Sequence, residues 1–126
     1  SQYHNAKTGS LFVAACVAGA QAAGADPAPW RGVGECLGEA YQVADDLRDA
    51  LCDVDELGKP VQRDAQLGRP SAVEELGVDG AVQRLRDLVA GAVAQVPVCP
   101  GAEALKALIA GESARILPKE LASRKP

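Results

Sequence analysis

The chain of 126 residues has no methionine, a single histidine and few aromatic side chains: one Trp, two Tyr and one Phe. It also lacks an apolar run long enough to cross a bilayer, so we do not expect an integral membrane protein. Proteins that bind nucleic acids combine a positive charge with stacking aromatic residues. Here 13 basic and 17 acidic residues give a net charge of -4. We therefore expect no nucleic acid partner.

The four cysteines, Cys16, Cys36, Cys52 and Cys99, show no CxxC spacing and there is only one histidine, so the sequence suggests neither a zinc site nor a small disulfide framework. Nothing at the N-terminus resembles a signal peptide. We expect reduced thiols and a cytoplasmic setting. Cys52 lies close to several carboxylates, which disfavour its thiolate, so we do not expect it to act as a nucleophile. The missing initiator methionine leads us to expect a fragment of something longer.

Strict alternation of apolar and polar residues, the pattern of a half-buried strand, is missing as well. Gly, Pro and capping signals instead divide the chain into helical segments, so residues 1–126 are predicted to form a single all-α region, a helical bundle. The predicted helices span about residues 7–23, 27–53, 72–76, 80–96 and 102–116. Ser71 followed by Glu74 is a capping-box pattern and predicts the start of the third.

Two of these helices have unusual compositions. The first, residues 7–23, is rich in alanine and nearly free of charge, so it is predicted to pack on most sides and to lie in the core. The second contains Gly32, Gly34 and Gly38. Each glycine costs up to about 1 kcal/mol relative to alanine inside a helix. That cost is tolerable where the glycine admits a close-packed neighbour or a ligand.

The most informative segment is residues 38–49, which read GEAYQVADDLRD. Their polar side chains recur three or four residues apart and share one face of a helix: Gln42, Asp45, Asp46 and Asp49. Like charges at these spacings destabilise a helix by a few tenths of a kcal/mol per pair, so we expect a cation to offset them. Clustered hard oxygen ligands suit Mg²⁺. We refer to these four residues as the acidic row, and they are predicted to form half of a metal site.

Cationic and hydroxyl side chains flank the acidic row in the sequence. Lys7 and Thr8 precede it, and Lys59, Arg63 and Arg69 follow it. Carboxylates bind Mg²⁺, the metal binds phosphate oxygens, and ammonium and hydroxyl groups bind the remaining oxygens. A diphosphate is therefore the ligand that this combination favours. A helical bundle with a solvated acidic surface remains the alternative.

These residues together resemble the C-terminal half of the trans-isoprenyl diphosphate synthases, the polyprenyl synthetase family. Residues 38–49 resemble the family's second aspartate-rich motif, GxxxQxxDDxxD, while Lys7-Thr8 resembles the family's Lys-Thr pair before that motif and Gly58-Lys59 resembles the lysine after it. Gln62 and Arg69 depart from the glycine and lysine that relatives usually have there. The resemblance covers most of the chain and implies the C-terminal portion of the isoprenoid synthase fold. Residues 37–73 are most similar to bacterial geranylgeranyl diphosphate synthases of carotenoid and photosynthetic pigment biosynthesis.

The resemblance implies a magnesium-dependent prenyltransferase, which condenses isopentenyl diphosphate with an allylic diphosphate and requires no side-chain nucleophile. It implies catalytic roles for Lys7, Thr8, Asp45 and Asp46. Asp45 would be a direct metal ligand, and Asp46 and Asp49 would be metal ligands or partners of metal-bound water. The implied contacts with substrate diphosphate are Lys7, Thr8, Gln42 and Lys59.

The family's first aspartate-rich motif lies in an N-terminal half that this sequence does not contain. We therefore expect the chain alone to be inactive, and to associate with the missing half or with a second copy as a homodimer. The alternative is a non-catalytic helical partner or regulatory subunit of a complete prenyl diphosphate synthase. The intact acidic row favours the catalytic interpretation, because a module freed from catalysis has no reason to keep clustered like charges.

Overall fold

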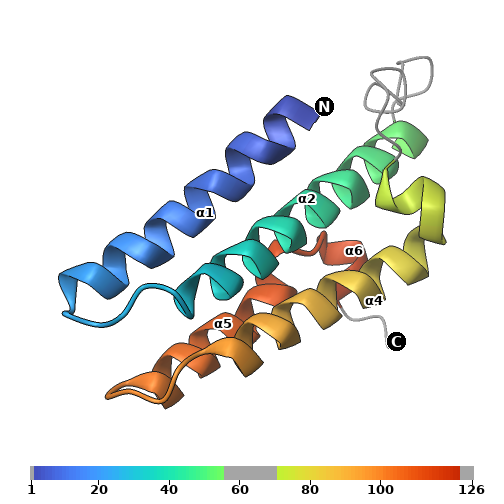
Figure 1. The fold of residues 1–126 in the computed structure, drawn as a ribbon. Coiled ribbons are helices and arrows are strands. Elements are labelled where there is room, and N and C mark those ends of the chain that lie inside the picture. The colour runs from blue at the N-terminus through green and yellow to red at the C-terminus, as the bar shows by residue number, and fades with distance from the viewer. Residues whose placement is uncertain (1, 56–70, 123–126) are drawn as a thin grey trace.

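The computed structural model describes residues 2–55 and 71–122, and Figure 1 shows their arrangement. The helices of this part of the chain are α1 (Gln2–Ala22), α2 (Trp30–Asp55), α4 (Ala72–Gln95), α5 (Ala102–Ile116) and α6 (Lys119–Ala122). These two ranges contain no strand. The predicted all-α fold class is therefore confirmed.

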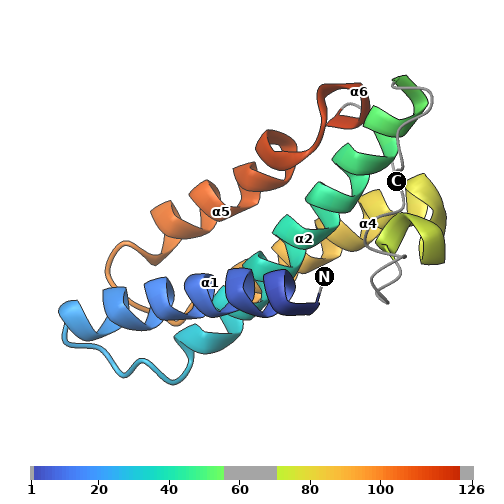
Figure 2. The ribbon, with the colours of Figure 1, turned by 90° about the horizontal axis from the view of Figure 1, so that it is seen from above.

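Helix α2 lies at the centre of the molecule, with α1 on one side and α4 and α5 on the other (Figure 1). From above, α1 lies over the first part of α2, and α5 runs to one side of both (Figure 2). The tightest core forms where α2 meets α4, and its fully buried members are Ala40, Ala44, Leu47, Ala81, Leu85 and Ala92. Their three-four spacing on each helix places them on one face, so α2 and α4 bury a continuous apolar seam.

The turn between α1 and α2 follows from its glycine, aspartate and prolines. Gly24 has a positive φ of 76°, which ends α1 without a side-chain clash. The Asp26 carboxylate accepts a hydrogen bond from the backbone N–H of Ala28 at 3.1 Å. The carbonyl of Pro27 accepts one from the N–H of Trp30 at 3.0 Å. Asp26 thus closes a turn ahead of the helix, and α2 begins at Trp30, slightly later than the predicted residue 27.

The predicted start of α4 is confirmed in atomic detail. Ser71 is the N-cap residue, with extended backbone angles, and its Oγ accepts a hydrogen bond from the N–H of Glu74 at 3.1 Å. Gly77, with φ 74°, kinks the helix, so the two predicted helices over 72–76 and 80–96 are the two arms of α4. Helix α5 covers residues 102–116 as predicted.

One prediction about packing was wrong. The segment 7–23 was expected to lie in the core, but in the structure α2 is the main neighbour of α1. Leu11 is 62% exposed, and Ala20 is the buried residue among the described side chains of α1. An evenly apolar helix shows that several of its faces can be buried, but it does not show that partners are present for all of them. No helix in residues 2–55 or 71–122 has the length and apolar character needed to cross a membrane.

Candidate functional site

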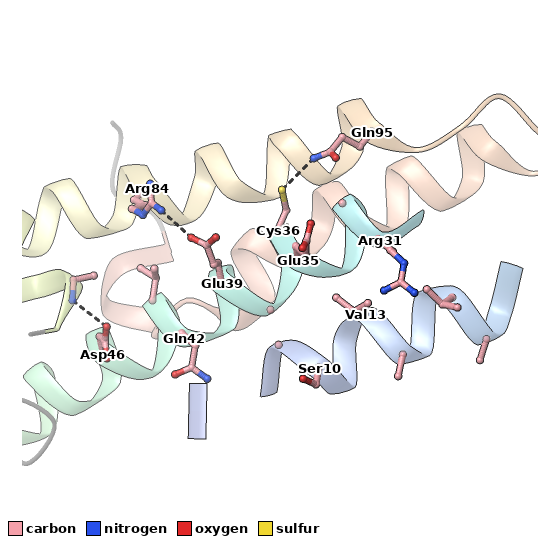
Figure 3. A pocket seen from close by; sticks show the side chains of 18 of the residues that line it. Ser10, Val13, Arg31, Glu35, Cys36, Glu39, Gln42, Asp46, Arg84 and Gln95 are labelled. Atoms are coloured by element: carbon pink, nitrogen blue, oxygen red, sulfur yellow. Dashed lines mark hydrogen bonds and ion pairs between the residues drawn. The ribbon is translucent and has the colours of Figure 1, made fainter. Parts of the chain in front are cut away.

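A groove of about 1270 Å³ runs between α1 and α2 and reaches α4. Gly9 and Ser10 of α1 line it opposite Gln42 and Asp46 of α2, and Arg84 of α4 lines its far wall. In Figure 3, α2 passes between α1 and α4 with Gln42 and Asp46 along its length. The groove therefore contains two members of the acidic row together with the turn of α1 that follows Lys7 and Thr8.

Two glycines of α2 bring the backbones of α1 and α2 into near contact. A Cβ atom at Gly34 would lie 2.7 Å from the Cα atom of Val13, and one at Gly38 would lie 3.1 Å from the Cα atom of Gly9. Cβ atoms in proteins essentially never come as close as the first of these distances. The prediction that glycines of this helix admit a close-packed neighbour is confirmed at Gly34 and Gly38. At this crossing, Gly9, Val13 and Gly38 line the groove, with Gly38 one turn before Gln42.

Asp46 is the buried polar residue of the described chain, with an exposed fraction of 3%. Its Oδ2 accepts a hydrogen bond from the backbone N–H of Ala72, the first residue of α4, at 3.0 Å (Figure 3). Gln42 lies one helical turn earlier and is half-buried. Because residues four apart share a face of a helix, both side chains line the same groove.

Asp45 has different surroundings. It is exposed and forms an ion pair with Arg48, whose Nη1 also donates a hydrogen bond to the carbonyl oxygen of Ile116 at 3.1 Å. Asp49 is exposed too, and neither Asp45 nor Asp49 lines the groove. Among the described side chains, those of residues 7–51, 71–119 and 121, no three His, Cys, Asp or Glu groups lie close enough together to hold a metal ion. Metal ligation by Asp45, Asp46 and Asp49 therefore stays a prediction.

The remaining predicted site residues lie around the groove or outside the described chain. Lys7 is exposed and Thr8 half-buried, and both directly precede the groove-lining residues Gly9 and Ser10. Their predicted contacts with diphosphate stay a prediction. Lys59, like Arg63 and Arg69, lies outside the described residues.

Sequence reasoning missed a cation on the wall of the groove. Arg84 is exposed on α4, and its Nη2 binds the carboxylate of Glu39 at 2.8 Å, which joins α4 to α2 (Figure 3). Further along the groove, the Nε2 of Gln95 donates a hydrogen bond to the Sγ of Cys36 at 3.2 Å. The carboxylate at Glu39, inside the motif, was the available signal for a cationic partner. The sequence could not show which arginine would reach it.

A second groove, of about 1120 Å³, lies between α1, α2 and α5 and is mostly apolar. The rings of Phe12 and Tyr41 line it with their centroids 4.9 Å apart. At its edge, Arg115 donates hydrogen bonds to the Tyr41 hydroxyl at 3.3 Å and to the Glu112 carboxylate at 2.6 Å. The hydrogen bonds that the Glu112 carboxylate accepts from Arg115 hold the pKa of Glu112 below its ordinary value. Burial raises the pKa of Cys16, which lines the same groove.

Comparison with known proteins places this arrangement in a family. Residues 1–97 match the family model of the polyprenyl synthetases. The chain is 51% identical over 124 residues to the geranylgeranyl diphosphate synthase of Cereibacter sphaeroides, a match that covers 98% of the chain and 43% of that protein. It is 47% identical over 107 residues to the geranylgeranyl diphosphate synthase of Rhodobacter capsulatus, covering 85% of the chain and 37% of that protein.

A more distant relative shares the same region. The farnesyl diphosphate synthase of Escherichia coli is 38% identical over 90 residues, which cover 68% of the chain and 30% of that protein. The chain thus spans less than half the length of the curated relatives it matches. No solved structure matches it. On the family match and these identities, the chain belongs to the polyprenyl synthetase family.

Proposed function

We propose that this chain contributes the second acidic wall of a magnesium-dependent prenyltransferase. The complete enzyme would condense isopentenyl diphosphate with an allylic diphosphate and give geranylgeranyl diphosphate. The observation that carries the proposal is the groove itself, which Gln42 and Asp46 line together with the turn of α1 that follows Lys7 and Thr8. Two residues of the acidic row thus share this groove with the segment of α1 that adjoins Lys7 and Thr8. The names of two relatives, both geranylgeranyl diphosphate synthases, support the product class.

The donor chemistry of the acidic row fits Mg²⁺. Carboxylate oxygens are its preferred protein ligands, and it usually keeps several waters and binds substrate phosphates as well. Asp45 would be a direct ligand, and Asp46 and Asp49 would be ligands or partners of metal-bound water. When bound, the metal would neutralise charge on the diphosphate and make it a better leaving group.

The side chains of the chain itself would bind and orient the substrate. Lys7 and Thr8 would donate hydrogen bonds to diphosphate oxygens, together with Gln42 and, from outside the described residues, Lys59. The walls formed by α1, α2 and α4 would shield the reacting carbons from water. In the reaction, the bond from the allylic carbon to diphosphate would break, the double bond of isopentenyl diphosphate would form the new carbon–carbon bond, and one proton would pass from the product to the departing diphosphate as a new double bond forms.

The proposed partners are the residues that supply the opposing acidic wall, or a second copy of the chain in a homodimer. Exposed apolar side chains such as Leu11 on α1 and Leu108 on α5 support an association of this kind. We propose a place in carotenoid biosynthesis from the family resemblance, and a cytoplasmic setting from the cysteine pattern.

A second candidate function is a non-catalytic helical partner of a complete prenyl diphosphate synthase. The observation that favours it is the ion pair between Asp45 and Arg48, because it offsets one carboxylate of the acidic row without a metal ion. The two candidates differ in whether Mg²⁺ and diphosphate bind to the chain.

Titration calorimetry with Mg²⁺ and inorganic diphosphate tests the proposal. We expect the wild-type chain to bind both together, and Asp45→Ala to weaken that binding by about tenfold or more because a direct ligand is lost. Asp87→Ala is the matched control, because it removes an exposed carboxylate of α4 that does not line the groove. If Asp45→Ala changed neither this binding nor the thermal stability, the proposed site would be wrong.

A further inference from the structure

The two neighbouring aspartates of the acidic row lie in opposite environments. Asp45 is exposed and paired with a side chain of its own helix, Arg48. Asp46 is 3% exposed and bonded to the backbone of another helix, at Ala72. The two carboxylates are neighbours in the motif, but they contact different groups.

Asp46 satisfies a backbone donor that would otherwise have no partner. The first N–H groups of a helix have no acceptor within the helix itself. In α4, the N–H of Glu74 is bonded to Ser71 Oγ at 3.1 Å, and the N–H of Ala72 is bonded to Asp46 Oδ2 at 3.0 Å. The negative charge of a carboxylate is also favourable at a helix N-terminus. Two side chains thus cap the start of α4: Ser71, which directly precedes the helix, and Asp46, which lies on α2.

This hydrogen bond determines where one wall of the groove begins. Ala72, Glu75 and Arg84 line the groove from α4, while Gln42 and Asp46 line it from α2. Asp46 and Ala72 are 26 residues apart in the sequence. The bond therefore ties together two walls that the chain connects only through a long intervening segment.

We propose that Asp46 is a positioning residue, which holds the start of α4 against α2 and thereby shapes the groove, while Asp45 is the aspartate that meets the metal ion. This inference rests on the function proposed above and narrows the role given there to Asp46. The distinction between Asp45 and Asp46 rests on the groups that their carboxylates contact.

Two substitutions remove the same hydrogen bond from opposite ends. Asp46→Ala deletes the acceptor. Ala72→Pro deletes the donor and leaves every predicted metal ligand in place. Proline is well tolerated at the first position of a helix, and Ser71, with φ -77° and ψ 159°, already has the extended conformation that a residue before proline prefers. Asp46→Asn keeps an oxygen that can accept from Ala72 and removes only the charge.

The first measurement is made without metal or diphosphate. By NMR, we expect Asp46→Ala to speed hydrogen exchange at the Ala72 amide by about tenfold, and Asp46→Asn to restore most of the protection. Ser71→Ala should loosen the Glu74 amide but not the Ala72 amide. Equal exchange at Ala72 in wild type and Asp46→Ala would overturn the inference.

A double-mutant cycle covers the case in which Asp46→Ala folds poorly. If the two residues act through one hydrogen bond, Asp46→Leu, which has a similar shape but no acceptor, should lower the melting temperature less in the Ala72→Pro background than it does in wild type. Fully additive shifts would contradict the inference. Because this cycle needs no ligand, it succeeds or fails independently of the proposed prenyltransferase function.

The last measurement distinguishes a positioning residue from a metal ligand. Ala72→Pro releases the Asp46 carboxylate. If that carboxylate were a ligand, release would leave the affinity for Mg²⁺ and inorganic diphosphate unchanged or higher. If Asp46 positions α4, the affinity should fall severalfold, because the wall that includes Ala72 and Arg84 loses its anchor. An unchanged or higher affinity would therefore rule out the positioning role, whereas a wild-type chain that bound no diphosphate would count against the proposed function alone.

Discussion

Arg48 connects the acidic row to the end of α5. Its guanidinium pairs with Asp45 and donates to the carbonyl oxygen of Ile116, the last residue of α5. The last carbonyl groups of a helix have no intrahelical donor, and a cation there also complements the negative end of the helix dipole. One side chain thus offsets a carboxylate and caps a helix. A metal ion that binds Asp45 has to compete with this pair.

Replacement of Arg48 by leucine should therefore affect stability and metal binding in opposite directions. We expect Arg48→Leu to lower the free energy of unfolding by about 1 kcal/mol, since the lost interactions are partly exposed. The affinity for Mg²⁺ and diphosphate should rise, because Asp45 loses its competing cation. Thermal unfolding and calorimetry measure the two effects. Arg115→Leu is the control, with the same change of charge beside the other groove; equal affinities in the two variants would contradict the argument.

A second prediction at this scale concerns Cys16. Burial raises the pKa of its thiol, so the neutral form is favoured in the folded chain. This contribution to stability is fully present below the ordinary pKa of a thiol and is lost as the pH rises through the raised pKa. With Cys36, Cys52 and Cys99 changed to serine, alkylation of Cys16 should show a higher pH midpoint in the folded chain than in urea. Equal midpoints would mean that burial does not affect this thiol.

The sequence predicted which of these residues share a helix face, but not which residues they contact on other helices. The spacing of Gln42 and Asp46 was enough to predict that they share a helix face, and the structure places both in one groove. The partner of Asp46 could not be predicted, because a hydrogen bond to a backbone N–H 26 residues away leaves no mark in side-chain spacing. The same holds for Arg84 and Glu39, whose ion pair depends on how α2 and α4 are rotated against each other.

At the scale of the helices, the crossing of α1 and α2 depends on small residues. Gly34→Ala places a Cβ atom 2.7 Å from backbone atoms that cannot rotate away. Although alanine favours a helix by up to about 1 kcal/mol, we expect a net loss of about 1–3 kcal/mol from overpacking. Urea unfolding followed by the fluorescence of Trp30 gives the value.

Gly19→Ala is the matched control for this substitution. A Cβ atom at Gly19, also within a helix, would meet nothing within 4 Å. This variant should therefore be up to about 1 kcal/mol more stable than wild type. If Gly34→Ala stabilised the chain by a similar amount, the close approach of the two backbones would be refuted.

The ends of the helices could be predicted more accurately than the faces on which each helix is buried. Ser71 and Glu74 predicted the start of α4, and α5 begins and ends at the predicted residues, since caps and prolines act over a few neighbouring positions. The placement of residues 7–23 in the core was wrong, because which faces of an apolar helix are covered depends on elements elsewhere in the fold.

At the scale of the whole molecule, the chain spans 43% of the length of a close relative and has exposed apolar side chains on α1 and α5. We expect the purified chain to form no prenyl product from isopentenyl and allylic diphosphates, because the opposing acidic wall is not among its residues. Radiolabelled isopentenyl diphosphate provides a sensitive assay. Robust product formation would show that one acidic wall is enough.

We also expect the purified chain to associate with a second copy of itself. Sedimentation at increasing concentration should reveal self-association, and Leu11→Glu should weaken it by placing a charge on the exposed face of α1. Val98→Glu is the control, since Val98 is fully exposed in the turn before α5. A monomer at every concentration, or equal effects of the two variants, would argue against an interface on α1.

The hydrogen bond between Asp46 and Ala72 also has a consequence for the order of folding. Closing a loop of 26 residues costs about 3 kcal/mol of chain entropy, whereas a hydrogen bond to a charged group contributes about 1.5–3 kcal/mol. This bond therefore at most offsets the cost of closing the loop, and we expect the apolar faces of α2 and α4 to meet first. Asp46 should accordingly make its contact after the folding transition state. Its substitution should speed unfolding and leave the folding rate nearly unchanged, as a late-forming contact requires.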